Sequence, residues 1–385
     1  MGTRERRAMP GPNVHLIGRP GAAAQMSTPC LVLARPAFDR NIAAAAQHCR
    51  AAGLALRPHA KTHKSSAVAR AQIEAGAAGL CVATVGEAEA MAAAGIDDIL
   101  ITSTFTQPAK IGRVVALART GVRLTVVLDD AGIAAQLAQA AAQAGIVLPA
   151  LIDVDLGRHR NGVSSEAGAL AVASAIASLP ALRLDGIQAY ASHISHLAGF
   201  AERLDASRTC AAVIAQIRSA LNAAGHPVRI VSGGSTGTLF IDTALDTYTE
   251  LQCGSYVFSD VEYAGIEITS DGRPPFEPAL VVRVSVIGRN WPGRVTCDGG
   301  NKHFSSRGTL PAFHAPPARG AVYRPDSDEH GIIELPDGAP QPALGTSFDL
   351  VVPHCDPTVN LFDAYHVVEN GTLVDVWPIE ARGAY

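Results

Sequence analysis

Short apolar runs alternate with alanine-rich helical segments over more than half of the chain, and this alternation most constrains the fold. The runs have the length of buried strands, and most segments between them carry apolar residues at i, i+3 and i+4, the period of a helix packed on a sheet. Eight such units predict a closed (β/α)8 TIM-type barrel, with an open doubly wound sheet as the structural alternative. The runs occupy residues 54–58, 79–84, 98–103, 123–129, 150–156, 184–190, 229–235 and about 250–257, and the helical segments include 86–95, 130–144, 165–178 and 200–224.

The helical period disappears after Tyr263, where short alternating strands separated by Gly/Pro turns predict an antiparallel β domain. A strand at 28–34 precedes the barrel, after an irregular arm, and we expect it to pair into this second domain. The predicted division is a barrel at 34–260 and a β domain made of 1–33 and 261–385. The later strands are expected at 278–288, 294–298, 347–352, 362–369 and 372–377.

Composition narrows the classes of function. A chain of 385 residues, 48% of them hydrophobic, can bury a large core. Its net charge of −4 gives no reason to expect a nucleic acid as partner, and no run of 18 apolar residues is present to span a membrane. Arg4, Arg6 and Arg7 are not followed by the apolar core of a signal peptide. The seven cysteines are scattered and form no CxxC pair, so we expect buried, reduced thiols in a cytoplasmic protein.

Lys61 follows the first apolar run, in the stretch RPHAKTHK at 57–64 that also contains His59. In a barrel this places the lysine at the carboxyl end of a strand, where active sites lie. The positive charges of Arg57, Lys64 and the imidazoles predict a lowered pKa for Lys61, which would leave free amine able to form a Schiff base with an aldehyde. The alternative is an ordinary solvated lysine at the start of a helix.

A loop rich in Gly and Ser follows the seventh run, with the sequence SGGSTGT at 232–238, and Gly254, Ser255 and Tyr256 follow the eighth. The loops after barrel strands seven and eight commonly hold phosphate, because backbone N–H groups and hydroxyls there can donate to an anion. Plain surface loops are the alternative. The residues expected to hold the phosphate are Ser235, Thr236, Gly237, Thr238, Gly254, Ser255 and Tyr256.

A Schiff-base lysine and a phosphate loop together match the two ends of pyridoxal 5'-phosphate. His59 is expected to contact this cofactor as well. Arg160 could face the ring nitrogen or the phenolic oxygen, and Tyr190 could pack against the ring. An arginine at the ring nitrogen would disfavour its protonation and make the ring a weaker electron sink than one facing a carboxylate. Arg160 as a solvated loop arginine is the alternative.

The stretch PHCDPT at 353–358 predicts a metal site. In extended backbone His354 and Asp356 project from one face while Cys355 points away. An imidazole and a carboxylate form half of a divalent metal site that suits Mn, Zn or Co and less readily Mg, with water or substrate completing the shell. A surface turn between two prolines is the alternative.

Two histidines at i and i+3, His193 and His196, follow the sixth run. Neutral imidazole titrates near working pH, so one of them could serve as a general base near the metal, and we favour His196. An exposed or helix-capping histidine is the alternative.

These motifs resemble those of the D-threonine aldolase and D-serine dehydratase family, relatives of alanine racemase. The similarity covers nearly the whole chain from about residue 27, and it includes RPHAKTHK at 57–64, GEAEA at 86–90, AGIDDIL at 94–100, GIQAY at 186–190, SGGSTGT at 232–238, ELQCGSY at 250–256, DEHG at 328–331, PHCDPT at 353–358 and ARGAY at 381–385. The resemblance implies a barrel plus β domain, pyridoxal phosphate on Lys61, a divalent metal on His354 and Asp356, and a homodimer.

Within this family, aldolases have the motif His-x-Asp at the metal and dehydratases have His-x-Cys. The spacing His354-x-Asp356 resembles the aldolase form. The resemblance therefore implies cleavage of a D-β-hydroxy amino acid to glycine and an aldehyde. The loop GRHR at 157–160 looks more like a dehydratase loop, and CVAT at 81–84, Ser235 and DGGNK at 298–302 also depart from the aldolase pattern. A D-serine or D-3-hydroxyaspartate dehydratase stays as the alternative, followed by an amino-acid racemase and a non-catalytic pyridoxal phosphate carrier.

Overall fold

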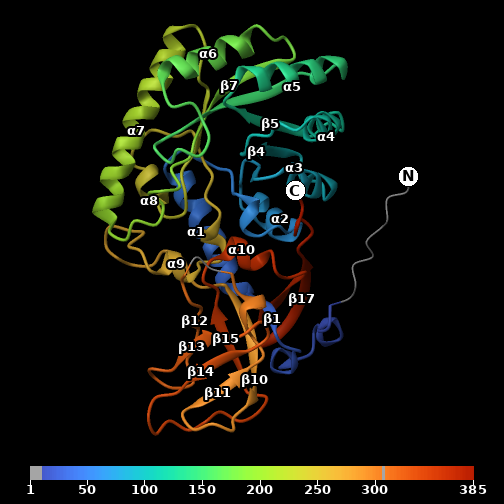
Figure 1. Ribbon diagram of the computed structural model, residues 1–385, viewed down its shortest axis with the longest axis vertical. Helices are drawn as coiled ribbons and strands as arrows, with labels where there is room; N and C mark the ends of the chain where they lie inside the picture. The colour runs from blue at the N-terminus through green and yellow to red at the C-terminus, as the bar shows by residue number, and fades with distance from the viewer. Residues whose placement is uncertain (1–10, 306–307) are drawn as a thin grey trace.

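The computed structural model describes residues 11–305 and 308–385, so Arg4, Arg6 and Arg7 of the expected arm lie outside the described chain. An eight-stranded parallel sheet forms its upper part in Figure 1. The strands follow the order β3-β4-β5-β6-β7-β8-β9-β2, and the two edges meet through a parallel bridge between His59 and Cys81. The strands are β2 (Ala55–Leu56), β3 (Leu80–Val82), β4 (Asp98–Ile101), β5 (Arg123–Leu128), β6 (Leu148–Val154), β7 (Leu182–Ala189), β8 (Ile230–Gly233) and β9 (Glu250–Leu251).

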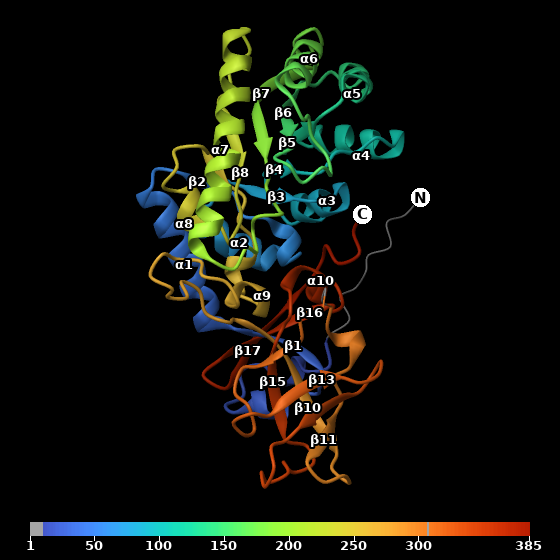
Figure 2. The ribbon, with the colours of Figure 1, turned by 60° about the vertical axis from the view of Figure 1, so that its left-hand side comes forward.

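Helices surround this sheet on the outside, which confirms the TIM-like class (Figures 1 and 2). Thr84, Asp130 and Ser165 begin three of them as N-caps, each side chain accepting a hydrogen bond from the third residue of its helix. The helices bury small and branched apolar residues on the sheet, which suits close helix–strand packing. They are α1 (Arg35–Ala51), α2 (Ser66–Glu74), α3 (Val85–Ala93), α4 (Pro108–Ala118), α5 (Ala131–Gln143), α6 (Glu166–Ala177), α7 (Phe200–Ala223) and α8 (Leu239–Asp242).

The second sheet is mixed rather than purely antiparallel, which corrects the expectation. Strand β1 (Cys30–Ala34) enters it between β10 (Leu280–Gly288) and β16 (Ala364–Glu369), antiparallel to the first and parallel to the second. A parallel neighbour is possible because a long stretch of chain, not a hairpin, connects these strands. The remaining strands are β11 (Arg294–Cys297), β12 (Ala312–Phe313), β13 (Val322–Pro325), β14 (Gly331–Glu334), β15 (Ser347–Val351) and β17 (Thr372–Pro378). The exact domain division at residues 34 and 260 stays a prediction.

Short helices fill the junction between the two sheets. Helix α10 (Cys355–Val359) comes from the β domain and packs against the 3-10 helix η3 (Ala60–Thr62) of the barrel, while η4 (Ser255–Val257) and α9 (Val261–Ala264) follow β9. The Tyr365 hydroxyl donates to the His63 carbonyl at 2.6 Å, which fixes the two parts together beside Lys61. Within the described residues no helix is long and apolar enough to cross a membrane. All seven cysteines are buried and free of disulfides.

Two local expectations were wrong. The run at 250–257 is a two-residue strand followed by a 3-10 turn, because the chain must bend at Gly254 past the start of η3. A Cβ at Gly254 would lie 2.5 Å from Thr62 Oγ1. The metal motif is extended only at His354, and Asp356 lies in the first turn of α10.

Candidate active site

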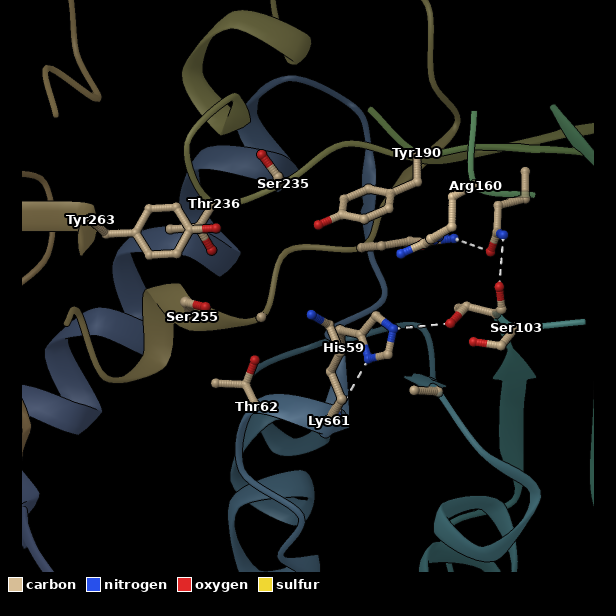
Figure 3. A pocket seen from close by; sticks show the side chains of 15 residues that line it. His59, Lys61, Thr62, Ser103, Arg160, Tyr190, Ser235, Thr236, Ser255 and Tyr263 are labelled. Atoms are coloured by element: carbon tan, nitrogen blue, oxygen red, sulfur yellow. Dashed lines mark hydrogen bonds between the residues drawn. The ribbon is translucent and has the colours of Figure 1, made fainter. Parts of the chain in front are cut away.

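A cavity opens at the carboxyl ends of the parallel strands and contains most of the predicted site (Figure 3). Ser235, Thr236 and Ser255 line one side of it, Arg160 lines the other, and Lys61 and Tyr190 lie between them. This spacing matches a molecule with an anionic end, a central aldehyde and a ring. The predicted lining residues are His59, Lys61, Arg160, Tyr190, Ser235, Thr236, Gly254 and Ser255, and those not predicted are Thr62, Ala83, Thr102, Ser103, Gln188, Gln252 and Tyr263.

Three predicted cofactor residues, Gly237, Thr238 and Tyr256, are not among the lining residues. Thr238 Oγ1 donates to Asp242 Oδ2 at 2.5 Å, below the loop. The Tyr256 ring is fully buried, and its backbone N–H donates to Thr236 Oγ1 at 3.0 Å. These residues therefore shape the loops that line the cavity.

Lys61 does not have the lowered pKa that its basic neighbours suggested. Burial lowers the pKa of its amine, but the Asp356 carboxylate, whose Oδ2 lies 2.7 Å from Lys61 Nζ, raises it above its usual value. The expected positive neighbours are neutralised, because Arg57 pairs with Glu250 and Asp98. Lys64 likewise pairs with Glu87. The charge that acts most strongly on Lys61 is therefore that of the Asp356 carboxylate in the metal motif.

His59 is held as a neutral ring at the start of η3. Its Nδ1 accepts from the Lys61 backbone N–H at 3.3 Å, so Nε2 carries the proton and donates to Thr102 Oγ1 at 3.0 Å. Burial holds the pKa of His59 well below its usual range. The ring can thus orient the lysine loop but has no spare nitrogen for proton transfer.

The metal motif has a buried carboxylate behind it. Asp260 Oδ2 accepts from His354 Nδ1 at 2.9 Å, from the Cys355 backbone N–H at 2.9 Å and from Cys355 Sγ at 3.0 Å. A carboxylate on one ring nitrogen is typical of a histidine that binds metal through the other. The Cys355 thiol is turned toward Asp260.

Asp356 is the second residue of the expected metal pair. Burial raises the pKa of this carboxyl, but the positive charges of Lys61 and His354 lower the pKa by more than burial raises it. The net pKa is well below its usual range, so the group is ionised. Its Oδ1 is buried and makes no hydrogen bond of normal geometry in the described chain. An anionic oxygen of this kind beside an oriented imidazole fits a divalent cation. Among residues 11–305 and 308–385 no cluster of three or more His, Cys, Asp or Glu is arranged for metal, so water or substrate would complete the shell.

His196, rather than His193, lies beside the metal motif. The His196 ring centroid is 6.0 Å from that of His354 and 4.5 Å from that of Tyr263. His193 faces Gly157 instead, at the base of the loop that leads to Arg160. Arg160 lies over the Tyr190 ring with its Cζ 5.9 Å from the ring centroid.

Several residues in and around the candidate site were not predicted because their sequence patterns are weak. Asp260 caps α9 by accepting from the Tyr263 N–H, a pattern that marks a helix start and not a metal site. Gln188, near the end of β7, and Gln252, directly after β9, are buried, and the Gln252 amide donates to the Gln188 side-chain carbonyl at 3.2 Å. A polar residue at the carboxyl end of an expected strand was the available clue.

A barrel with a lysine-containing cavity at the carboxyl ends of its strands, joined to a β domain, defines the class of alanine racemase-like, pyridoxal phosphate-dependent enzymes. Residues 34–261 match the alanine racemase N-terminal domain, and residues 279–368 match the putative serine dehydratase domain. An alanine racemase from Clostridium difficile shares the fold, with a TM-score of 0.72 at 12% identity over 92% of this chain and 99% of that one.

More similar relatives narrow the class. The chain is 38% identical to a D-threonine aldolase from Arthrobacter sp over 94% of both chains, and 36% identical to a 3-hydroxy-D-aspartate aldolase from Paracoccus denitrificans over 94% of this chain and 93% of that one. The crystal structure of a D-threonine aldolase from Filomicrobium marinum superposes with a TM-score of 0.89 at 34% identity, covering 94% and 97% of the two chains. A D-threo-3-hydroxyaspartate dehydratase from Delftia sp. is 31% identical over 91% of this chain and 97% of its own. The chain belongs to the D-threonine aldolase family of pyridoxal phosphate-dependent lyases.

Proposed function

We propose that this lyase is an aldolase that cleaves D-configured β-hydroxy amino acids of the D-threonine type to glycine and an aldehyde. It would use pyridoxal 5'-phosphate on Lys61 and a divalent metal, one of Mn, Zn, Co or Mg, on His354 and Asp356. The 2.7 Å contact between Lys61 Nζ and Asp356 Oδ2 carries this proposal. It places the amine that would hold the cofactor next to the carboxylate that would hold the metal, so one substrate can reach both with its amino and β-hydroxyl groups.

Different residues of the cavity would bind different parts of the cofactor. The hydroxyls of Ser235, Thr236 and Ser255 can donate to a phosphate group at one side. Lys61 would form the covalent link to the aldehyde, and Arg160 and Tyr190 would hold the ring. When bound, the cofactor accepts the electron pair of the breaking Cα–Cβ bond.

His354, Asp356 and His196 would act on the substrate hydroxyl. A divalent ion held by His354 and Asp356 makes a nearby hydroxyl more acidic. His196, next to the His354 ring, would take the hydroxyl proton as general base, so that the oxygen forms the aldehyde carbonyl as the Cα–Cβ bond breaks. The bond's electron pair stays with Cα, and protonation there gives glycine.

A dehydratase is the second candidate, and the dehydratase-like loop at 157–160 favours it. Here a base, such as Lys61, would take the α-proton and the β-hydroxyl would leave, giving an oxo acid and ammonia. The spacing His354-x-Asp356 favours the aldolase. A racemase or a cofactor carrier would have no use for this pair. A homodimer, by family resemblance, and a cytoplasmic location, from the scattered buried cysteines, remain part of the proposal.

The test is a product assay with D-threonine and D-3-hydroxyaspartate, on protein loaded with pyridoxal phosphate and Mn²⁺, with and without chelator. Glycine that disappears on chelation supports the aldolase, whereas oxo acid with ammonia supports the dehydratase. Turnover of neither substrate would rule out both. Lys61→Arg is the matched control: it keeps a cation beside Asp356 but cannot form the Schiff base, so borohydride should trap the cofactor on the wild-type peptide only.

A further inference from the structure

Arg203, in α7, is a fully buried arginine whose hydrogen bonds all run to backbone carbonyls. Its Nε donates to the Gly237 carbonyl at 2.7 Å, its Nη1 to the Leu197 carbonyl and its Nη2 to the Glu267 carbonyl. It does not line the cavity, and the proposed reaction does not use it. A guanidinium has five donors in a rigid fork, which suits it to hold several chain segments at once.

The three carbonyls belong to three loops around the site. Gly237 lies in the predicted phosphate loop at 232–238, and Leu197 directly follows His196. Glu267 follows α9, the helix that Asp260 caps, and its N–H donates to the Ala198 carbonyl at 2.9 Å. The first two loops touch directly, because a Cβ at Gly237 would lie 2.0 Å from the Ser195 carbonyl oxygen. Arg203 is thus the common anchor of the phosphate loop and the His196 loop.

The charge of Arg203 is not matched by a carboxylate among its hydrogen-bond acceptors. Burial lowers the pKa of its guanidinium, and the charges of Glu267 and Glu202 offset this in part. The Glu267 carboxylate is occupied elsewhere, accepting from the Phe200 N–H at 3.1 Å. A buried charge with carbonyls as its only direct partners is costly to hold, and an anion close to it would lower that cost.

The Gly237 carbonyl connects this charge to the cavity. Because it points at Arg203, its negative end is held away from an anion bound against the neighbouring Ser235 and Thr236, both of which line the cavity. We infer that Arg203 is a positioning residue for the cofactor's phosphate group: it sets the Gly237 peptide, supplies positive charge behind the loop, and ties phosphate binding to the placement of the His196 loop. This rests on the proposed function in one respect, that the loop at 232–238 holds the phosphate.

The test compares the full-length variants Arg203→Gln and Arg203→Lys with Arg208→Gln, which removes an exposed arginine from the same helix. Affinity is measured for pyridoxal phosphate and for pyridoxal, which lacks the phosphate, and the thermal shift of the cofactor-free protein is measured with inorganic phosphate. We expect Arg203→Gln to weaken pyridoxal phosphate binding by about tenfold or more, to leave pyridoxal binding within about threefold, and to abolish the phosphate-induced shift. Arg208→Gln should match the wild type.

Equal losses for both ligands with an unchanged phosphate shift would overturn the inference, since a merely structural arginine would act in that way. If Arg203→Gln does not fold, Arg203→Lys provides the test, because lysine keeps the charge but makes fewer hydrogen bonds. We expect this variant to have a smaller preference for pyridoxal phosphate over pyridoxal than the wild type. An unchanged preference would contradict the inference. A wild-type protein that shows the Arg203-dependent phosphate shift but cleaves no amino acid would contradict the proposed function alone.

Discussion

The side chains of Lys61, His59 and His354 are each held by a protein partner. The partners are Asp356 for Lys61, Thr102 for His59 and Asp260 for His354. Such pairs fix rotamers and tautomers before a ligand arrives, which reduces the entropy lost on binding. The reactivity of the site thus depends on Asp356 and Asp260, which do not line the cavity, as well as on the lining residues.

The two histidines after β7 should differ in their contribution to catalysis. We expect His196→Asn to lower kcat by roughly 10²- to 10⁴-fold, because the residue next to His354 would no longer take the hydroxyl proton. His193→Asn, three residues earlier and facing Gly157, is the matched control and should keep kcat within a few-fold. Steady-state rates with D-threonine measure both, and the reverse ranking would assign the base to His193.

Replacing Asp260 by Asn should weaken metal binding. The variant keeps the size of the side chain but loses the charge that holds His354 Nδ1, so we expect the Kd for Mn²⁺ to rise about 10- to 100-fold. Titration calorimetry on the full chain measures this. Glu262→Gln is the control, because the Glu262 carboxylate lies further from His354 Nδ1, at 3.7 Å, and should matter less. Unchanged Mn²⁺ affinity in Asp260→Asn would show that the buried carboxylate does not support a metal ligand.

The identity of the site residues could largely be predicted from the sequence, but their electrostatics could not. Lys61, His354 and Asp356 belong to compact motifs, and polar residues at strand ends converge in any barrel of this kind. The pKa of Lys61, by contrast, depends on Asp356, which is 295 residues away along the chain. No local pattern shows that Arg57 and Lys64 are neutralised by Glu250 and Glu87.

At the scale of elements, the site is assembled from short turns. Strand and helix positions followed the apolar periodicity closely, whereas η3, η4 and α10 were not predicted, because three to five residues carry too little periodicity to identify a turn of helix. Strands β12, β13 and β14 were also missed. They are two to four residues long and only partly buried, so the alternation of apolar and polar residues is hard to detect.

Gly254→Ala tests how closely these turns are packed. The added methyl group would meet Thr62 Oγ1 at 2.5 Å and the His59 carbonyl at 3.1 Å, so η3 and the loop after β9 would have to separate. We expect a loss of about 1–3 kcal/mol in unfolding free energy and weaker binding of pyridoxal phosphate. Gly112→Ala, in the open interior of α4, is the control and should stabilise by about 0.5–1 kcal/mol. Denaturant melts and cofactor titration measure both effects, and normal cofactor affinity in Gly254→Ala would mean that the two turns are not closely coupled.

At the scale of the whole molecule, Asp242 should make stability depend on pH. Burial raises the pKa of this carboxyl to about 7, although Thr238 lowers it in part, whereas an unfolded chain has an aspartate pKa near its usual value of about 3.9. The folded protein therefore holds this proton more tightly. As pH rises from about 4 to about 7, the unfolded state releases this proton and the folded state keeps it. The free energy of unfolding therefore falls by up to roughly 1.4 kcal/mol per pH unit.

Asp242→Asn removes this titration, so the variant should be more stable than the wild type above pH 7, with a difference that shrinks toward pH 4. Urea unfolding at pH 8 and pH 5 measures it. Asp246→Asn, an exposed neighbour, is the control without such a trend. A difference for Asp242→Asn that does not change with pH would mean that the carboxyl does not titrate in this window.

The insertion of β1 between β10 and β16 determines when the second sheet can form. The Thr28 hydroxyl donates to Ser285, which is made 257 residues later, and β16 is made later still. While the ribosome completes the barrel, Leu31 and Leu33, fully buried in the finished protein, have none of their partners on β10. An unpaired apolar strand is a site for chaperone binding and for aggregation until its neighbours emerge. The second sheet of this enzyme can therefore form only after β10 and β16 have been synthesised, and β1 stays unpaired until then.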